Sequence, residues 1–431
     1  MKHFYKKNLM LLSGAFLLLT NEGQAQFMLS AEVRPRAELR SGFKTVIAEK
    51  EESAFFVEQR SRLKTDYQAE KLKLRLTLQD VRIWGNTSQI YKTDASLFNV
   101  YEAYGEYQFT PKLAMRVGRQ ELDYDNARFL GNLDWAQQGR SHDALKFMYA
   151  DSSGFALHAG AGFNQSVVSE PTKLFDTYYS GYDNYKTMQY VWAHKTWSRT
   201  NLSLLVFNDG RQRPDSTVAY RQTYGLNGDV KLGTVKLGGE LYYQGGKDAA
   251  GKKVQAWLAA ASATVQTKVT PLTVGVDYLS GTSQGDTQNQ SFTPLYGTNH
   301  AFYGFMDYFY VGNGHGQSGR TTGLTDFYLK TNFKLGKQSS LLAHFHHFES
   351  PVAVYSPPEA SGTMSSRLGE EIDLVLNRNF SPDFNLKVGY SQLYASSSLE
   401  TLKGKQGSGL NQWAWVMLTF KPVLFQQQSS I

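Results

Sequence analysis

An alternation of polar and apolar side chains with a period of two residues runs through most of this 431-residue sequence. The segment from Lys71 to Leu78 reads Lys-Leu-Lys-Leu-Arg-Leu-Thr-Leu, and the charges of residues 31–40 and 57–67 also fall at every second position. Residues two apart on a β-strand share one face, whereas this spacing would scatter the same charges around a helix. The pattern therefore predicts an all-β protein whose strands are charged on one face and apolar on the other.

The number of these segments and the connections between them narrow the fold class. About 18 segments can be distinguished, with starts expected near residues 29, 54, 70, 99, 112, 142, 154, 187, 200, 220, 234, 252, 271, 322, 339, 367, 383 and 411. Short turns alternate with longer polar loops, the largest of which runs from about residue 282 to 321. This alternation is typical of outer-membrane barrels, which have tight periplasmic turns and long external loops. We therefore predict a transmembrane antiparallel up-and-down β-barrel with both termini on the periplasmic side.

The two ends of the chain fit export to the outer membrane. Lysines precede an apolar run from Leu9 to Leu19, and small residues at Gly23 and Ala25 suit cleavage before Gln26. This run is too short to span a bilayer as a helix, so residues 1–25 are predicted to be a cleaved signal peptide. We expect the barrel to occupy residues 26–422 as one domain, and residues 423–431 to form a short C-terminal tail.

The composition agrees with a barrel whose lumen is filled with water. After the first segment no apolar run approaches the ~20 residues of a membrane helix. Yet the chain holds 26 Tyr, 26 Phe and 7 Trp. Barrel strands reconcile the two observations because only alternate residues face lipid. The absence of cysteine excludes disulfides and thiolate metal sites. The net charge of +7 is mild, so we expect membrane lipid and solutes as partners and no nucleic acid.

The charged faces of the first three segments can point only into the lumen. A Lys or Arg on the lipid face costs up to ~2–4 kcal/mol near the midplane, so exposing all of these side chains to lipid would cost on the order of 20 kcal/mol. Acidic residues lie between the basic ones, so the set can be a salt-bridge network that stiffens the wall. It can equally be an electropositive track that favours anions. The basic residues are Arg34, Arg36, Arg40, Arg60, Arg62, Lys64, Lys73 and Arg75.

One connection is too apolar for a solvated loop. Residues 121–135 contain Leu122, Phe129, Leu130 and Trp135. A barrel of about 18 strands leaves an aqueous channel unless loops or side chains fill it. We therefore expect this segment to fold inward and narrow the pore.

Several motifs resemble the signature of the alginate export family of outer-membrane porins, over about residues 30 to 422. The motifs lie at residues 34–36, 117–122, 128–135, 139–144, 294–300, 304–309 and 368–373. The resemblance implies an 18-stranded barrel with an arginine-rich constriction that passes an anionic uronate polymer such as alginate. Carried over by position, it makes Arg34, Arg36, Arg60, Arg62, Arg119, Arg128 and Arg140 the predicted conduit, with Asp125, Asp134 and Asp143 as organising partners. Arg75 joins the conduit from the charge pattern alone.

The mechanism expected from these residues is diffusion, without catalysis or a cofactor. Arginine forks bind carboxylates one or two at a time, and many weak sites let a chain advance without being trapped. A general anion or small-solute porin without polymer specificity is the alternative within the channel class. The choice between these two cargo classes stays open, because fold alone does not fix the cargo. Periplasmic export proteins are further expected partners.

Two other functional classes, an enzyme and a surface receptor, are alternatives to a pore. An enzyme is disfavoured because Ser141, His142 and Asp143 are neighbours on a strand, where alternate side chains point to opposite faces and cannot form a triad. His344 and His346 share a face, but the sequence offers no clear third ligand, so no metal site is predicted. A surface receptor would use a tyrosine-rich loop. Its tyrosines are Tyr178, Tyr179, Tyr182 and Tyr185.

Overall fold

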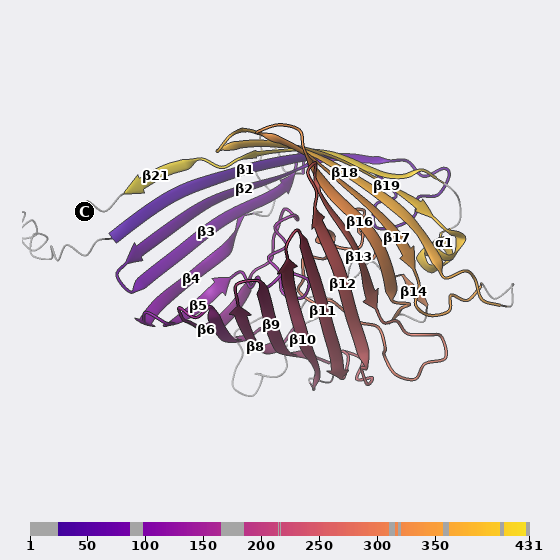
Figure 1. Cartoon of the computed structure of the whole chain (residues 1–431), viewed down its shortest axis with the longest axis horizontal. Coiled ribbons are helices and arrows are strands. Elements are labelled where there is room, and N and C mark those ends of the chain that lie inside the picture. Colours follow the sequence, from indigo (N-terminus) through magenta and orange to yellow (C-terminus); the bar gives the residue numbers. More distant parts are fainter. Residues whose placement is uncertain are drawn as a thin grey trace, which may run out of the picture.

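The computed structural model describes residues 25–86, 98–164, 185–213, 215, 217–309, 315–317, 320–356, 362–405 and 409–427. Each long strand pairs antiparallel with the next, and β1 pairs with both β2 and β20, so the sheet closes into a barrel (Figure 1). The barrel strands are β1 (Ala25–Ser41), β2 (Ala54–Ala69), β3 (Leu72–Ile83), β4 (Phe98–Thr110), β5 (Leu113–Gln120), β6 (His142–Ala150), β7 (Phe155–Phe163), β8 (Thr187–Thr196), β9 (Thr200–Gln212), β10 (Val218–Leu232), β11 (Val235–Gly246), β12 (Ala256–Gln266), β13 (Pro271–Leu279), β16 (Leu324–Lys334), β17 (Ser339–Glu349), β18 (Arg367–Ser381), β19 (Phe384–Ala395) and β20 (Asn411–Phe420). The prediction of an 18-stranded antiparallel barrel is confirmed, and every strand begins within four residues of its expected start.

The C-terminal segment differs from the expected tail. After a turn at Pro422, strand β21 (Val423–Gln427) pairs with residues 27–30 of β1. The reason is a difference in strand length: β1 has 17 residues, whereas β20 has 10 and pairs with β1 only from Val33 onward. Without β21, the first half of β1 would present an unpaired edge, which proteins usually cover. The barrel wall therefore continues through Gln427.

The strand faces follow the alternation seen in the sequence. On β3 the outward side chains of Leu72, Leu74 and Leu76 are exposed, while Arg75 and Thr77 on the opposite face contact other polar groups. Exposed apolar side chains on a closed barrel face the lipid, where they need no protein cover. No helix in the described ranges is long and apolar enough to cross a bilayer.

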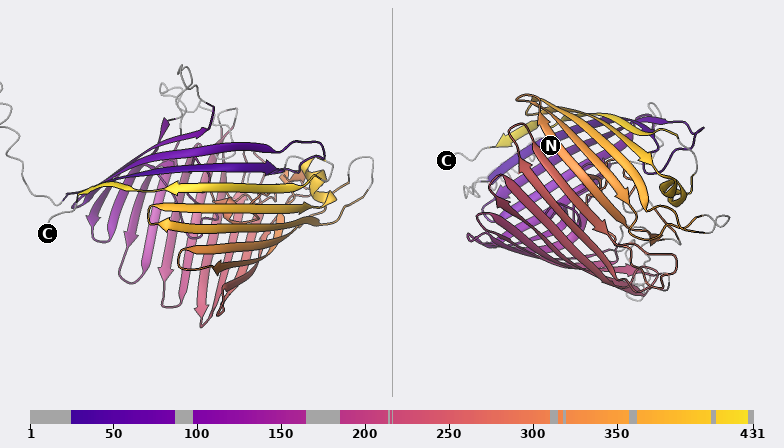
Figure 2. Two further views of the ribbon diagram at one scale, coloured as in Figure 1. Left: turned by 90° about the horizontal axis from the view of Figure 1, so that it is seen from above. Right: turned by 45° about the vertical axis from the view of Figure 1, so that its right-hand side comes forward.

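The connections sort into two ends, as Figure 2 shows from two further sides. Tight turns such as Gly233–Thr234 lie at the end where the described chain begins and ends, which we call the short-turn end. The longer connections lie at the opposite, long-loop end. They include α1 (Ser397–Lys403) between β19 and β20, and residues 280–323 between β13 and β16, with η2 (Asn299–Ala301), β14 (Gly316–Gln317) and β15 (Arg320–Thr321).

An apolar core lies inside the barrel. It joins side chains from two long connections, residues 121–141 and 280–323, to aromatic and aliphatic side chains of the surrounding strands. Its members include Leu122, Phe129, Leu130, Tyr296, Tyr303, Met306, Phe207, Phe348 and Trp413. We call residues 121–141 the first inward loop and residues 280–309 the second inward loop.

Candidate functional site in the barrel lumen

The two inward loops are bonded to each other inside the barrel. The amide of Gly131 donates to the carbonyl of Tyr296 at 2.7 Å, and Arg140 Nη1 donates to the carbonyl of Gly297 at 2.8 Å. Gly297 permits this approach, since a Cβ there would lie 2.1 Å from the carbonyl oxygen of Arg128. The prediction that residues 121–135 fold inward is confirmed. The second inward loop was expected to be a polar external loop, and its aromatic stretch at residues 292–309 is the signal that could have revealed its position.

Both loops hold bulky residues in the left-handed backbone region. The φ angles are +52° at Leu133, +60° at Tyr296 and +58° at Tyr303. Such conformations cost about 1–3 kcal/mol each for residues other than glycine, and they persist where surrounding contacts determine them. The side chains of Tyr296 and Tyr303 are almost fully buried in the core. Packing and hydrogen bonds therefore hold the loops in one conformation.

One end of the first inward loop is tied to the arginines of β1 and β2. The Asp134 carboxylate lies 3.4 Å from Arg34, 2.9 Å from Arg60 and 3.4 Å from Arg62. Arg34 also donates to the Asp134 carbonyl at 2.8 Å. Burial alone would raise the pKa of Asp134, but the nearby arginines outweigh it, and the pKa is lowered. Arg60 is fully buried, whereas 45% of the Asp134 side chain is exposed. We call this contact the arginine anchor.

An aromatic stack extends the anchor to the second inward loop. The guanidinium of Arg36 lies over the Trp135 ring at 4.5 Å, and His300 stacks on that ring at 4.4 Å. Arg36 is itself buried and donates to Glu38 at 2.7 Å. His300 lies 2.9 Å from the Asp307 carboxylate. Trp135 therefore joins the β1 wall to both loops.

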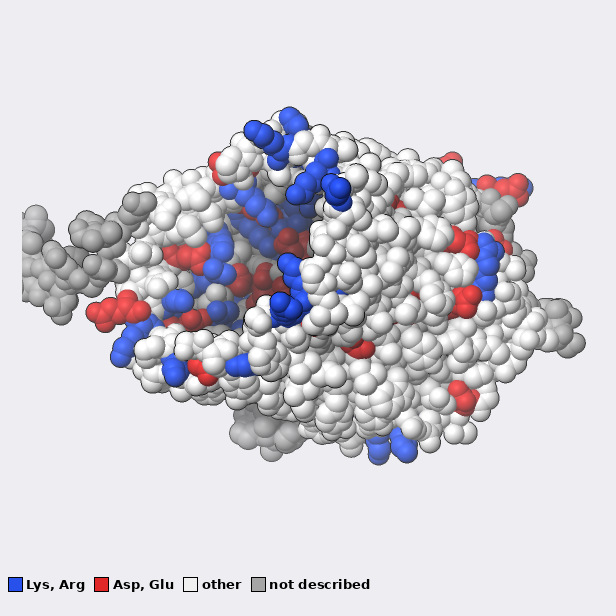
Figure 3. Space-filling model, viewed as in Figure 1, with Lys and Arg blue, Asp and Glu red and all other residues white. Residues whose placement is uncertain are grey.

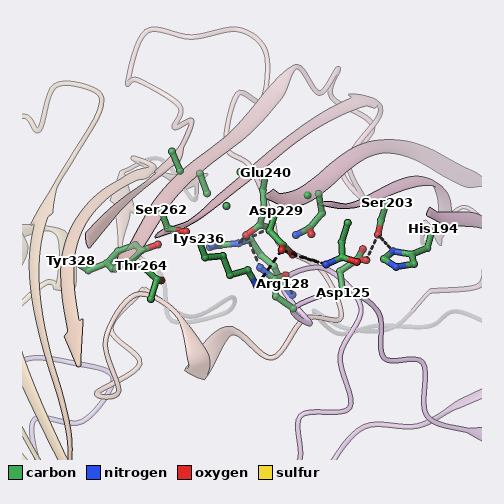
Figure 4. A pocket seen from close by; sticks show the side chains of 18 residues that line it. Asp125, Arg128, His194, Ser203, Asp229, Lys236, Glu240, Ser262, Thr264 and Tyr328 are labelled. Carbon is green, nitrogen blue, oxygen red and sulfur yellow. Dashed lines mark hydrogen bonds and ion pairs between the residues drawn. The ribbon is translucent and has the colours of Figure 1, made fainter. Parts of the chain in front are cut away.

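The other end of the first inward loop is tied to the far wall of the barrel. Arg128 donates to Glu240 on β11 at 3.0 Å and to Asp277 on β13 at 2.8 Å, and Asp277 and Glu240 keep its pKa above the usual value despite its burial. Asp125 accepts hydrogen bonds from Ser203 at 2.5 Å and Trp192 at 3.1 Å. Figure 4 shows the contacts of Arg128 with Glu240 and of Asp125 with Ser203 at the edge of a cavity of about 410 Å³. The loop therefore spans the lumen from β1 and β2 to β8, β9, β11 and β13.

The lumen wall between the first inward loop and the short-turn end, which we call the vestibule, has a different charge arrangement. Its ion pairs join cations of β2, β3, β5 and β11 to carboxylates of β2, β4 and β10. In Lys73–Glu106 the exposed fractions are 48% for the lysine and 6% for the glutamate, and in Lys236–Asp229 they are 53% and 25%. The same order holds for Lys64–Asp66, Arg75–Glu102 and Arg116–Glu106. Figure 3 shows charged side chains gathered in a hollow, while the surrounding surface carries few.

The predicted conduit residues thus separate into groups. Arg34, Arg36, Arg60, Arg62, Arg140 and Asp134 meet around the first inward loop. Arg128 and Asp125 contact the far wall, and Arg75 lies in the vestibule. Four vestibule cations are absent from the predicted conduit. Lys64 and Lys73 belong to the basic wall predicted from the charge pattern, whereas Arg116 and Lys236 do not.

Arg119 and Asp143 are placed differently from the rest. They pair at 2.9 Å, and both side chains are substantially exposed. Strand alternation places them with Val117 and Leu145, which are exposed on the outer face of the barrel. Both border a cavity of about 440 Å³ at the long-loop rim. The expectation that they line the conduit is corrected by the register of β5 and β6.

The residues of the disfavoured functions can also be located. His142 points into the lumen, where its Nδ1 lies 3.1 Å from the Tyr185 hydroxyl, while its neighbour Asp143 lies on the opposite face. The tyrosines at 178, 179 and 182 lie outside the described residues.

Comparisons with known proteins agree with this architecture. Among solved structures, the chain resembles Pseudomonas aeruginosa OccK9 (OpdG), with a TM-score of 0.61 and 12% identity, covering 92% of this chain and 98% of that one. It also resembles P. aeruginosa OccK2 (OpdF) in complex with glucuronate, with a TM-score of 0.58, 12% identity and coverage of 93% and 98%. A BenF-like porin from Pseudomonas fluorescens Pf-5 has a TM-score of 0.58, 12% identity and coverage of 92% and 99%. Likeness at this identity shows the fold.

Comparison with sequences assigns the family. No curated protein sequence matches the chain. The alginate export family profile matches residues 26–408, nearly all of the barrel. The chain belongs to the alginate export family and forms a β-barrel pore of the cell outer membrane.

Proposed function

We propose that this pore passes anionic solutes, above all carboxylates of the uronate type, along a lumen wall of exposed lysine and arginine side chains. The observation that carries the proposal is the order of exposure in the vestibule. In each vestibule pair the cation reaches further into the open lumen than its carboxylate partner. A passing solute therefore meets positive charge first, although the pairs are nearly neutral as a whole.

The arrangement suits movement along the pore better than tight binding. Charged side chains on a low-dielectric wall focus the field inside a channel and raise the local concentration of the opposite charge. Conduction also requires sites that are weak enough to release the solute. Each vestibule cation is already partly neutralised by its own carboxylate, such as Lys73 by Glu106 at 3.4 Å. A solute carboxylate can thus exchange between cations without being held by one of them.

The substrate class rests on chemistry and family. Members of the alginate export family are named for a polymer of uronates, and the structurally similar OccK2 was solved with glucuronate, a single uronate. We propose an anionic polysaccharide such as alginate as the cargo, and a general anion or small-solute pore as the alternative. The inward loops bear on this choice, because a polymer must thread past them while a monosaccharide needs only a small gap.

Reversal potentials across a planar bilayer in a salt gradient test the proposal. We expect the wild-type pore to prefer anions and the triple variant Lys64→Gln, Lys73→Gln, Lys236→Gln to lose most of this preference. The matched control is Lys252→Gln with Lys253→Gln, two exposed lysines of the loop that joins β11 to β12. A cation-selective wild-type pore would contradict the proposal.

A second measurement separates the two cargo classes. Oligouronates of increasing length are added to one side, and blockade of the single-channel current and arrival on the other side are recorded. Transit of chains longer than a disaccharide supports polymer passage. Permeation by glucuronate alone, with longer chains excluded, assigns the pore to small solutes.

A further inference from the structure

Two histidines and an aspartate converge on the lumen wall, on strands that contribute to neither the arginine anchor nor the vestibule. His344 and His346 lie two residues apart on β17, and Asp373 on β18 pairs directly with His344 in the ladder. One ligand atom of each residue lies within 4.8 Å of the others, and His346 Nε2 is 3.9 Å from Asp373 Oδ2. The two histidines share a face in the sequence pattern, which shows no third ligand. The pairing of β17 with β18 adds Asp373 as the third ligand.

Neighbouring residues orient two of these side chains. The Asp326 carboxylate lies 2.9 Å from His346 Nδ1, which places the ring proton on Nδ1 and leaves a lone pair on Nε2. Ser391 Oγ donates to Asp373 Oδ1 at 2.5 Å and leaves Oδ2 directed toward the histidine. His346 is about 1% exposed, and its Nε2 has no hydrogen-bond partner. Carboxylates that orient a ligating histidine in this way are typical of protein metal sites.

The charge around the cluster favours a cation. Asp326, Glu371 and Asp373 are fully buried, and none forms an ion pair with a Lys or Arg in the part of the chain that the structure describes. Buried carboxylates that are not fully compensated by cations are costly. The Lys330 ammonium lies over the Tyr328 ring, 4.5 Å from the centroid, and is close enough to attract Asp326 and Asp373, but this one cation is outnumbered by the three carboxylates.

We propose that His344, His346 and Asp373 bind a first-row divalent transition-metal ion, with Zn²⁺ as the reference ion. Imidazole ligands favour such ions, whereas Ca²⁺ and Mg²⁺ prefer sites made only of oxygen. Ligands at ~2.0–2.1 Å from a tetrahedral ion lie roughly 3.3 Å apart, so the side chains contract slightly around it. Three protein ligands leave a fourth position for water or a further carboxylate.

The site lies where the second inward loop meets the barrel wall. The Phe305 amide is 3.4 Å from Asp373 Oδ2, and its ring centroid is 5.1 Å from that of His344. The Met306 amide donates to Glu371 at 2.7 Å. A bound ion would therefore stiffen the part of the wall that holds this loop. The proposal does not depend on which solute the pore passes.

Calorimetric titration of Zn²⁺ into the full barrel tests the site. The protein is refolded in detergent without a polyhistidine tag and treated with a chelator beforehand. We expect one Zn²⁺ per chain, and at least 100-fold weaker binding in His346→Ala and in Asp373→Asn. Asp326→Asn, which alters only the orienting carboxylate, should weaken binding about 10- to 100-fold. The matched control His194→Ala changes a lumen histidine whose ring nitrogens already bond to Ser203 and Thr196.

A spectroscopic measurement on the wild-type barrel keeps the test independent of how the variants fold. X-ray absorption at the zinc edge should show two imidazoles among the ligands of the bound ion. Absence of saturable Zn²⁺ binding, or binding that is unchanged by both His346→Ala and Asp373→Asn, would overturn the proposal. Binding of Mg²⁺ or Ca²⁺ in preference to Zn²⁺ would overturn it as well.

Discussion

The arginine anchor and the vestibule share strand β2, yet their ion pairs have opposite orders of exposure. At the anchor, Arg60 is fully buried and the Asp134 carboxylate faces the open lumen. In the vestibule, Lys73 is exposed and Glu106 lies against the wall. The difference arises because the first inward loop covers one part of the wall and leaves the other open. The same row of alternating charges thus anchors a loop in one place and, as we propose, attracts anions in the other.

The residue types match the two environments. Arginine presents several donors in a planar fork and loses little on burial, so it can bind carbonyl and carboxylate groups of a covering loop at the same time. Arg34 does this through the carbonyl and the carboxylate of Asp134. Lysine carries a compact, strongly hydrated charge that is better kept in water. Lys64, Lys73 and Lys236 are exposed in the vestibule accordingly.

Truncation of Arg60, the buried arginine of the anchor, should cause the largest loss of stability. In Arg60→Ala, Glu32 and Asp134 lose their shared partner. Breaking a buried pair in this way destabilises proteins by about 3–5 kcal/mol. We expect this loss in urea unfolding of the barrel in lipid vesicles, together with noisier single-channel currents as the first inward loop loosens.

The control for this variant is Arg82→Ala, which removes an exposed arginine paired with Asp80 at 2.6 Å. Exposed pairs contribute about 0–1 kcal/mol, so its unfolding curve should nearly match that of the wild type. Equal losses in both variants would show that the anchor does not depend on burial.

Neutralising the exposed carboxylate should have a smaller and different effect. In Asp134→Asn, Arg34, Arg60 and Arg62 lose one negative partner but keep their contacts with backbone carbonyls. The expected destabilisation is about 1–3 kcal/mol. The reversal potential should shift toward stronger anion preference, because three cations are then less neutralised. Asp143→Asn, on the outer face, should leave the reversal potential unchanged.

The alternation of charges was sufficient to predict the barrel, its strand starts and the lumen direction of Arg34 and Arg60. Each of these follows from a two-residue period and from the cost of charge in lipid. The second inward loop could not be predicted in this way. Tyr296 and Tyr303 are buried by contacts with strands far away in the sequence, and an aromatic loop segment also suits a membrane interface.

The site prediction was limited in the same way, because it depends on which residues of neighbouring strands face each other. Asp373 becomes a neighbour of His344 only through the register of β17 and β18. Arg119 lies three residues after Arg116 and therefore on the opposite face of β5. The motif alone does not show this difference. Exposure was a further limit, since the sequence cannot show that a loop covers Arg60 and leaves Lys73 in water.

Added salt should separate the two regions without any mutation. The Debye length falls from ~8 Å at 0.15 M to ~3 Å at 1 M, so exposed charges are screened and buried ones much less. We expect anion preference to decline severalfold between 0.1 and 1 M KCl, while the unfolding free energy changes little. Selectivity that persists at 1 M would show that anions are selected by the charges of the buried anchor and not by those of the vestibule.

A half-buried lysine at the long-loop end offers the finest test, because it is the residue type of the vestibule in a place with less access to water. Lys403 at the end of α1 donates to the carbonyl of Tyr308 at 2.6 Å and to that of Lys44 at 3.1 Å. Burial lowers the pKa of Lys403 to about 7. When α1 detaches, the pKa returns to about 10.4, so between these values the detached form binds one more proton. Docking of α1 should therefore weaken as pH falls from about 10 to 7, by at most ~1.4 kcal/mol per pH unit, and level off below pH 7.

Hydrogen exchange of the amides of α1, corrected for the intrinsic rate, measures this docking equilibrium at each pH. Lys403→Met should abolish the slope, whereas Lys405→Met, which alters an exposed pair with Glu51 at 2.7 Å, should keep it. Exchange in α1 that does not change with pH in the wild-type barrel, or a slope that survives Lys403→Met, would contradict this role of Lys403.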